Sequence, residues 1–572
     1  MKRLSNIGIL FVLLLSMGCT ESVKKAPAPS MKESEGPAMQ IGVSYYPEQR
    51  PRESWNVDFE MLVDAGIKRI RMGEFAWSTL EPEEGQYDFH CFDDCIELAQ
   101  RYGIQVVMCT PTAAPPIWLV EKHPEILPVN SDKQRNTFGA RQHRCYNTPA
   151  YNQHSRIIVD KLAARYANHP NVVAWQIDNE MGGEQKRCYC DFCREDFQAY
   201  LEDKYENVAK LNKRWGNAFW SLDYQRFDQL ILPYRYNATL MLKHHPSLEL
   251  EFSRFSSASI VSFSNMQASL IKSHNPQVLI CTNRFAYEWG DNVDSYELNL
   301  ELNVAGFDLY STQKHQIAFY ADLNRSLNPT HNWVMEYGTH SPDLLSEMEL
   351  LESRGVQWLY FFKLNPFPAG MEQSMQSMLT ITGAPTANYE LVKQWNLDHQ
   401  SAKAIQHTDP DIGLYYDFDC SWALAQEGWG SYREKLVYQS CVIDTIYRAL
   451  YAPANPVQIF QTPQHFQKVK TLILPQQVIH KPALETALIE FIESGGSVIT
   501  THNLFVKNVD NVYLSRTPRI YREVMNGSGE FFLDAPSEAM EFSYGKGKLI
   551  LVADKAGCED WRAILEAYRQ NP

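Results

Sequence analysis

From residue 41 onward the chain alternates between short apolar runs and longer stretches with helical periodicity. The apolar runs, rich in β-branched and aromatic residues, are residues 41–45, 67–72, 104–109, 172–177, 278–282, 304–309, 333–335 and 356–362. Apolar residues recur at helical spacing in the intervening residues 55–65, 92–102, 155–167, 260–274 and 344–354. Near-continuous apolar strands that alternate with helices indicate a parallel sheet covered on both faces.

Eight such units in succession predict a (β/α)8 TIM barrel, an α/β fold, over residues 40–398. The alternative is a doubly wound open sheet, which would place a glycine-rich phosphate-binding turn after the first strand. The residues found there are Tyr46, Pro47 and Glu48, which are unlike such a turn. Active sites in barrels lie at the carboxyl ends of the strands, so polar residues that follow an apolar run are the candidates for function.

Beyond residue 399 the eightfold pattern stops. Residues 412–416, 471–474 and 497–500 are predicted strands, and residues 437–450 and 484–494 are predicted helices. This pattern predicts an open α/β domain over residues 399–535. Residues 536–572 are predicted to form a closing hairpin and a helical tail.

The start of the chain has the pattern of an export signal. A basic Met1-Lys2-Arg3 precedes a short apolar run over residues 7–15, which is too short to span a membrane permanently. Gly18-Cys19 at its end resembles the cleavage site of a bacterial lipoprotein, although Ser16 stands where leucine is usual. We therefore expect an exported lipoprotein with a signal over residues 1–19, an acylated Cys19 as the only membrane contact, and a flexible tether over residues 20–39. Plain secretion and an uncleaved anchor are the alternatives.

Composition excludes several classes of protein. With 44% apolar and 21% charged residues among 572, the chain is neither disordered nor a small disulfide scaffold. Its 68 acidic residues outnumber its 53 basic residues, and the net charge of −15 argues against a nucleic-acid partner. Aromatic residues make up 12% of the chain, which fits either a large core or platforms that stack on sugar rings.

Two glutamates follow directly on predicted barrel strands. Glu180 comes after residues 172–177, preceded by Asn179, and Glu336 comes after residues 333–335. A buried carboxylate at such a position has a desolvation cost, so it is expected to be paired with another group or to take part in function. Two carboxyl groups about 5–5.5 Å apart can cleave a glycosidic bond with retention, one as acid and one as nucleophile.

Three cysteines lie within six residues, at positions 188, 190 and 193. Three thiols at this spacing cannot all pair with one another, and short loops strain a disulfide, so they suit one tetrahedral metal ion better. Disulfides in an oxidising compartment are the alternative.

Several ordered blocks resemble glycoside hydrolase family 42, the retaining β-galactosidases. These blocks are residues 42–48, 71–77, 111–116, 141–147, 175–180 and 215–220. The resemblance implies that Glu180 is the general acid/base and Glu336 the nucleophile of a retaining exo-β-galactosidase that removes terminal β-D-galactose from oligosaccharides. It implies that Arg141 binds the sugar and keeps the nucleophile ionised, and that Asn179 bonds the sugar 2-hydroxyl. Tyr310 would bond the nucleophile, and Glu372 would contact sugar hydroxyls.

The same resemblance implies a structural Zn²⁺ and a trimer. Cys145 would join Cys188, Cys190 and Cys193 as the fourth zinc ligand. Residues 399–535 would be a glutamine-amidotransferase-like domain that mediates a homotrimer. No Cys-His-Glu nucleophile set is recognisable there, so we expect this domain to be structural.

The chain departs from the family at two places. The family continues its nucleophile segment into a tryptophan that walls the galactose subsite, whereas residues 337–343 contain none. After the eighth strand Lys363 stands in a segment where an aromatic residue and an arginine are common. A β-L-arabinopyranoside, a β-D-fucoside or an agar- or carrageenan-type galactan oligosaccharide is therefore an alternative substrate. A catalytically dead, lipid-anchored sugar-binding protein is the alternative from another class, and the presence of both glutamates and Arg141 counts against it.

Overall fold

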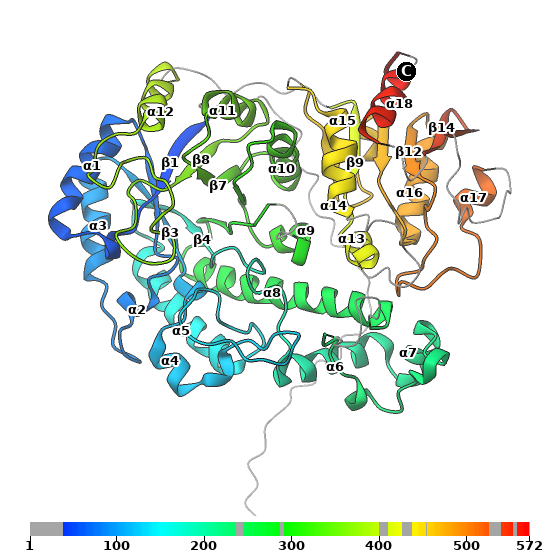
Figure 1. Cartoon of the computed structure of the whole chain (residues 1–572), viewed down its shortest axis with the longest axis horizontal. Helices are drawn as coiled ribbons and strands as arrows, with labels where there is room; N and C mark the ends of the chain where they lie inside the picture. The colour runs from blue at the N-terminus through cyan, green and yellow to red at the C-terminus, as the bar shows by residue number, and fades with distance from the viewer. Residues whose placement is uncertain are drawn as a thin grey trace, which may run out of the picture.

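The computed structural model describes residues 38–235, 244–286, 291–399, 410–425, 438–453, 455–525, 539–552 and 557–570. The predicted signal, Cys19 and nearly all of the predicted tether lie outside these ranges. Within them, no helix is long and apolar enough to cross a membrane. Two α/β units lie side by side, an N-terminal barrel and a smaller C-terminal domain (Figure 1).

The first unit is the predicted eight-stranded parallel barrel. Its strands are β1 (Gln40–Ser44), β2 (Arg69–Met72), β3 (Gln105–Cys109), β4 (Val172–Gln176), β5 (Leu279–Cys281), β6 (Ala305–Leu309), β7 (Asn332–Gly338) and β8 (Trp358–Phe362). They pair in the order β5-β4-β3-β2-β1-β8-β7-β6. A parallel bridge between Arg284, just beyond β5, and Phe307 of β6 closes the ring. All eight predicted strands are confirmed.

Helices cover the outside of the barrel (Figure 1). They are α1 (Trp55–Asp64), α2 (Trp77–Leu80), α3 (His90–Arg101), α4 (Ile117–Lys122), α5 (Pro149–Tyr166), α6 (Asp191–Tyr205), α7 (Val208–Trp215), α8 (Pro246–His274), α9 (Ser295–Asn299), α10 (Lys314–Leu327), α11 (Leu344–Ser353) and α12 (Ala387–Asp398). The predicted helix over residues 260–274 is the second half of α8. Its first half lacks a simple apolar stripe, because its buried positions include Ser253, Ser256 and Ser257. The Ser256 hydroxyl donates to the carbonyl four residues back.

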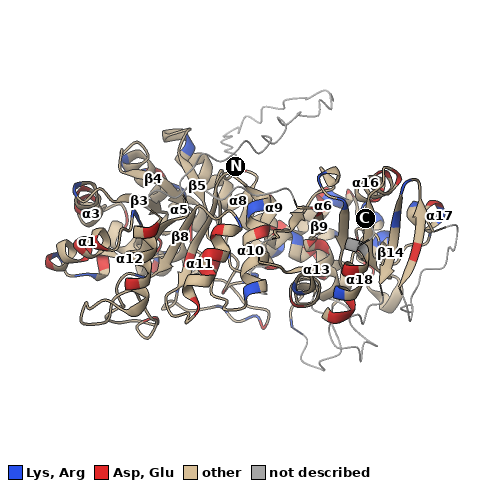
Figure 2. Cartoon of the chain, turned by 90° about the horizontal axis from the view of Figure 1, so that it is seen from above, with Lys and Arg blue, Asp and Glu red and all other residues tan. Residues whose placement is uncertain are grey.

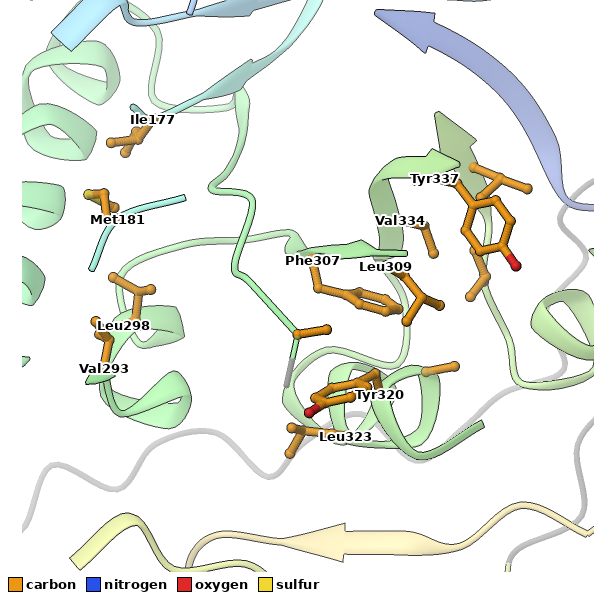
Figure 3. Packing of buried hydrophobic residues seen from close by; sticks show 14 of the residues in the cluster. Ile177, Met181, Val293, Leu298, Phe307, Leu309, Tyr320, Leu323, Val334 and Tyr337 are labelled. Atoms are coloured by element: carbon orange, nitrogen blue, oxygen red, sulfur yellow. The ribbon is translucent and has the colours of Figure 1, made fainter. Parts of the chain in front are cut away.

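Strand β6 illustrates how the barrel presents polar side chains. Phe307 and Leu309 pack outward against Tyr320 and Leu323 of α10 (Figure 3). Because successive side chains of a strand point to opposite faces, Asp308 between them points into the barrel. An ionisable side chain is thereby placed inside the ring, next to β7.

The second unit has a six-stranded sheet, in the order β10-β9-β11-β12-β14-β13. Its strands are β9 (Ile412–Tyr415), β10 (Gln458–Phe460), β11 (Thr471–Leu474), β12 (Ser497–Thr501), β13 (Met540–Tyr544) and β14 (Gly547–Val552). Its helices are α13 (Phe418–Ala425), α14 (Tyr438–Ser440), α15 (Arg448–Leu450), α16 (Pro482–Glu493), α17 (Arg519–Glu523) and α18 (Cys558–Gln570), with a π-helical turn over Cys441–Tyr447. The predicted open α/β domain is confirmed.

The boundary predicted at residue 536 is wrong. Strands β13 and β14 form the expected antiparallel hairpin, but β14 also pairs in parallel with β12. The hairpin therefore completes the second sheet and is not a separate tail.

A buried ionic cluster joins the two units. Asp322 of α10 accepts a hydrogen bond from Arg354, which also belongs to the barrel. It accepts two more from the second unit, from the Tyr447 hydroxyl and from the backbone N–H of Val457. Elsewhere, acidic and basic side chains are interspersed over both units (Figure 2). The second unit is thus docked on α10, on the outside of the barrel.

Candidate active site

Glu180 lies just beyond β4 in a turn that the backbone does not adopt readily. Asp178 and Glu180 have φ angles of 53° and 45°, in the left-handed region that non-glycine residues seldom occupy. The Glu180 N–H donates to Asn283 Oδ1 at 3.0 Å, and Gln142 Nε2 donates to the Glu180 carbonyl at 3.0 Å. Such backbone strain persists only where the surroundings enforce it, and it concentrates at functional sites.

The Asp178 side chain bonds this turn to two neighbouring residues. Its carboxylate accepts hydrogen bonds from Arg144 and Thr112, both at 2.6 Å, and both Arg144 and Asp178 are fully buried. The turn that carries Glu180 is therefore fixed to the loops that follow β3.

Glu336 lies within β7, with its neighbour Asp308 on β6. The two residues are partners in the strand register, which shifts between Phe307 and Asp308. The β7–β8 pairing shifts as well, between Val334 and Tyr337. These irregularities bring Glu336 to the mouth of the barrel, whereas Tyr337 turns outward and donates to Glu347 of α11.

The two glutamates meet inside one site. One carboxylate oxygen from each of Glu180, Asp308 and Glu336 lies within 4.8 Å of the others, and all three residues are buried. This spacing suits the carboxyl pair of a retaining glycosidase, about 5–5.5 Å, and is too short for the 6.5–9.5 Å of an inverting one.

Three donors surround the Glu336 carboxylate. Arg71 Nη2 donates to Oε1 at 2.6 Å, Asn283 Nδ2 donates to the same oxygen at 3.2 Å, and the Tyr310 hydroxyl donates to Oε2 at 2.6 Å. Burial, together with the negative charge of Glu336, raises the pKa of Tyr310 well above its usual value, so its hydroxyl stays protonated and donates. These three donors fix the orientation of the Glu336 carboxylate.

Arg141 has a different partner from the one predicted. Its Nη2 donates to Glu180 Oε2 at 3.1 Å, and its other contacts are Glu184 at 2.8 Å and Glu372 at 3.5 Å. The expectation that Arg141 holds the nucleophile ionised is wrong, because Arg71, fully buried in β2, occupies that place. Glu372 lies beside Arg141 at the barrel mouth, where it can reach a bound sugar.

The surroundings of Glu180 favour its protonated form. Burial, and next the charge of Glu336, raise the pKa of Glu180 to about 8, although Arg141 opposes the shift. Asn179 Nδ2 lies 3.2 Å from Glu180 Oε2, and Asn179 Oδ1 accepts from Asn283. A carboxyl group that is protonated at neutral pH and faces an ionised carboxylate can act as a general acid.

Asp308 is a third carboxyl group that sequence reasoning missed. Burial and the charges of Glu336 and Glu180 raise its pKa well above the usual value, and it interacts with Glu180 by a hydrogen bond. Asn283 Nδ2 donates to Asp308 Oδ2 at 2.7 Å. Asp308 therefore adds a third buried carboxyl group beside Glu180 and Glu336.

Arg71 and Asn283 were also missed as site residues. Asp308 stands inside an otherwise apolar predicted strand, Arg71 lies in a predicted strand that also holds Lys68 and Arg69, and Asn283 follows the fifth strand closely. Burying an unpaired charge within a barrel strand costs free energy, so the sequence alone could have marked Arg71 and Asp308 as candidate site residues. The partner of each could not be read from the chain alone.

The four cysteines at positions 145, 188, 190 and 193 form one cluster. Their Sγ atoms all lie within 4.8 Å of one another, and Cys145 Sγ is 3.4 Å from Cys193 and 3.7 Å from Cys190. These separations exceed an S–S bond of about 2.05 Å. They match the sulfur spacing of about 3.8 Å that follows from a tetrahedron with Zn–S bonds of about 2.3 Å. The donor set and its geometry therefore fit a closed zinc site.

A (β/α)8 barrel with two strand-end glutamates at this spacing, one with a raised pKa and one bonded by an arginine, has the site of a retaining glycoside hydrolase. Comparisons with known proteins identify the family. Residues 44–400 match the sequence model of a family described as β-galactosidase, glycoside hydrolase family 42, and residues 410–570 match that of a β-galactosidase trimerisation domain. The chain belongs to this β-galactosidase family and is a glycoside hydrolase.

Individual relatives agree with this assignment. The chain is 31% identical over 562 residues to the β-galactosidase BgaA of Clostridium cellulovorans, covering 92% of this chain and 81% of the relative. It is 30% identical over 505 residues to the β-galactosidase Bga of Halorubrum lacusprofundi, covering 83% of this chain and 71% of the relative. A solved structure of a β-galactosidase from the latter organism superposes with a TM-score of 0.84 at 26% identity, covering 93% of this chain and 89% of that one.

Proposed function

We propose that this chain is a retaining exo-β-galactosidase in which Glu336 is the nucleophile and Glu180 the general acid/base. The observation that carries the proposal is the 4.8 Å cluster of carboxylate oxygens from Glu180, Asp308 and Glu336. Hydrolysis of nitrophenyl β-D-galactoside, compared with the β-D-glucoside and the α-D-galactoside, tests it. A preference for the β-galactoside of at least tenfold supports the proposal, and equal or absent turnover overturns it.

The reaction proceeds by double displacement. Glu336 attacks the anomeric carbon while Glu180 gives its proton to the departing glycosidic oxygen, so the C–O bond breaks as the galactosyl–Glu336 ester forms. Glu180, now a carboxylate, takes a proton from water, which attacks the same carbon and releases galactose with retained configuration. Three further side chains would bind the sugar, namely Asn179, Arg141 and Glu372, which lie next to Glu180 or to one another.

The rate should depend on pH with a bell-shaped profile. Because burial and Glu336 raise the pKa of Glu180 to about 8, the acid needed for the first step is present below that pH and is lost as pH rises through it. We expect kcat/KM to fall on the basic side with an inflection near pH 8. A profile that stays flat between pH 4 and 9 contradicts the paired carboxyl groups.

We also propose that Cys145, Cys188, Cys190 and Cys193 hold a structural Zn²⁺. Four thiolates leave no open coordination position, so the ion has no part in the reaction. It would join the loop of Arg141 to the loop that follows Glu180. Gln142 already bonds the carbonyls of Asn179 and Glu180 across the same two loops.

Removal of this metal should loosen the site and destabilise the fold. We expect Cys190→Ser to lower zinc content from about one ion per chain to near zero, and to lower Tm by several degrees. The matched control is Cys558→Ser, a half-buried cysteine outside the cluster. Metal analysis and thermal unfolding provide the readout. Equal zinc content in the two variants contradicts the assignment.

A homotrimer is our proposal for the assembled enzyme. It is supported by the match of residues 410–570 to a trimerisation domain. Light scattering should give about three times the 65.9 kDa of the chain, less the processed N-terminus. A monomer mass at micromolar concentration excludes it.

We propose that the enzyme is exported and anchored through a lipid on Cys19, on the basis of the sequence pattern of residues 1–19. Cys19→Ala should move the protein from the membrane fraction to the soluble one. If the wild-type protein is already soluble in cell fractionation, the anchor is absent.

A further inference from the structure

Asp308 lies within the catalytic site but takes no part in the double displacement. It is 1% exposed, and it stands on β6 beside its register partner Glu336. One of its carboxyl oxygens lies within 4.8 Å of an oxygen of Glu180 and of one of Glu336. Three buried carboxylates this close together would repel one another, so at least one group of the three is expected to carry a proton.

The hydrogen-bond donors are shared unequally among the three carboxyl groups. Glu336 and Glu180 each accept a hydrogen bond from an arginine. Among the residues that the structure describes, the only N–H donor to Asp308 is the neutral side-chain amide of Asn283, at 2.7 Å from Oδ2. Oδ1 of Asp308 is buried and accepts from no donor. Asp308 is therefore the carboxyl group with the least support for a negative charge.

The charged and titratable groups around Asp308 and Glu180 come from most of the barrel strands. They are Arg71 of β2, Arg141, Glu184 and Glu372 of the loops, Cys281 of β5, Arg284 after β5, Tyr310 of β6 and Glu336 of β7. Burial, then the charges of Glu336 and Glu180, raise the pKa of Asp308 well above its usual value, and Arg71 opposes the shift. Arg71 is bonded to Glu74 and Glu336, so it does not pair with Asp308.

A protonated Asp308 has one hydrogen to donate, and Glu180 is the acceptor beside it. Because Oδ2 accepts from Asn283, the hydrogen belongs on Oδ1, the oxygen without a donor. The carboxyl groups of Asp308 and Glu180 interact by a hydrogen bond, which requires a proton on one of them. When Glu180 has given its own proton to the departing oxygen, its carboxylate can accept this bond, and a hydrogen bond to the charged form stabilises that form.

We propose that Asp308 is a positioning residue that keeps its proton throughout the reaction and donates a hydrogen bond from Oδ1 to the carboxyl group of Glu180. This bond holds the acid/base in place and stabilises its carboxylate while the galactosyl ester exists. The inference rests on the proposed β-galactosidase function, with Glu180 as the acid/base.

The first test compares two substitutions of Asp308 by the pH dependence of kcat/KM for phenyl β-D-galactoside. Asp308→Asn is neutral and keeps a hydrogen-bond donor, so we expect kcat/KM within about fivefold of wild type and a basic limb that stays near pH 8. Asp308→Leu keeps the branched shape without a donor and should lower kcat/KM about 10–100-fold. Its basic limb should move to higher pH, because burial then raises the pKa of Glu180 without the opposing hydrogen bond. Asp203→Asn, an exposed position on α6, is the matched control and should behave as wild type.

Infrared difference spectroscopy provides a second test that needs no turnover. The spectrum of wild type minus that of Asp308→Asn at pH 7 should contain the C=O stretching band of a protonated carboxyl group. Carboxylate bands in its place overturn the proposal, whether or not Asp308→Leu folds.

The kinetic outcomes also decide the question. If Asp308 is ionised, Asp308→Asn removes a negative charge beside Glu180 and moves the basic limb to lower pH, which overturns the proposal. Equal losses in Asp308→Asn and Asp308→Leu, with the basic limb unmoved, show a purely structural role and overturn it as well. Wild-type protein that hydrolyses no β-galactoside overturns the proposed function and with it the part of Asp308 in the reaction. The infrared band distinguishes that failure from a wrong protonation state.

Discussion

Glu336→Ala is expected to lower kcat on every β-galactoside by at least about 10⁴-fold, because the galactosyl ester can no longer form. The cavity left by the side chain faces the anomeric carbon, flanked by Arg71 and Tyr310. Azide fits there and can attack in place of the carboxylate. We therefore expect azide to restore turnover and to yield the inverted α-galactosyl azide, identified by NMR of the product.

The control for this variant is Glu349→Ala. Glu349 is an exposed glutamate of α11, outside the site, and its loss should leave kcat within a factor of two. The assignment of Glu336 fails if the Glu336→Ala variant retains more than about 1% of wild-type kcat without azide. It also fails if the azide product has the β configuration.

Glu180→Ala is expected to have an effect that depends on the leaving group. Galactosides with a poor leaving group should be slowed about 10²–10⁴-fold, the usual range for loss of a general acid. A dinitrophenyl galactoside, whose leaving group needs no proton, should still form the galactosyl enzyme rapidly. Its turnover is then limited by the second step, where azide replaces the activated water and yields β-galactosyl azide. Steady-state kinetics with the two substrates, with and without azide, measures this.

The pH profile supplies an independent check on Glu180. Since its raised pKa of about 8 sets the basic limb, that limb should be absent in Glu180→Ala. Asn283→Ala removes a side chain that accepts from the Glu180 backbone N–H and donates to the Glu336 carboxylate, and it should lower the rate but keep a basic limb. Equal losses on both substrates in Glu180→Ala, or an α-galactosyl azide product from it, show that the two roles are exchanged.

Most strands of the barrel could be predicted because they are buried on both faces and are therefore rich in apolar residues, although β2 carries Arg69 and Arg71. The candidate glutamates could be predicted for a related reason, since each breaks such a run at the end where barrels place their sites. Short strand β10, with three residues, was missed because a run of that length carries little pattern. The first half of α8 was missed because its serines hide the apolar periodicity.

The sequence could not show which charged side chains contact one another in the site. Arg141 was expected to serve the nucleophile, but the turn that follows β4 brings Glu180 to it, while Arg71 reaches Glu336 across the barrel. Asp308 sits in an apolar run, and its closeness to Glu336 depends on a register shift between β6 and β7. The loop between β8 and α12 folds back on the end of β8, where the N–H groups of Met378 and Leu379 donate to the carbonyls of Lys363 and Leu364, and no local pattern in the sequence marks that pairing.

The roles of the two glutamates are tested most directly by trapping the covalent intermediate. A deoxyfluoro-galactosyl fluoride slows both steps and lets the ester accumulate, and peptide mass spectrometry then locates the label. We predict one galactosyl group per chain, attached to Glu336, with no label in Glu336→Ala. Attachment to Glu180 or Asp308, or steady hydrolysis of ordinary galactosides with no labelled peptide at all, would contradict the double displacement described for this enzyme.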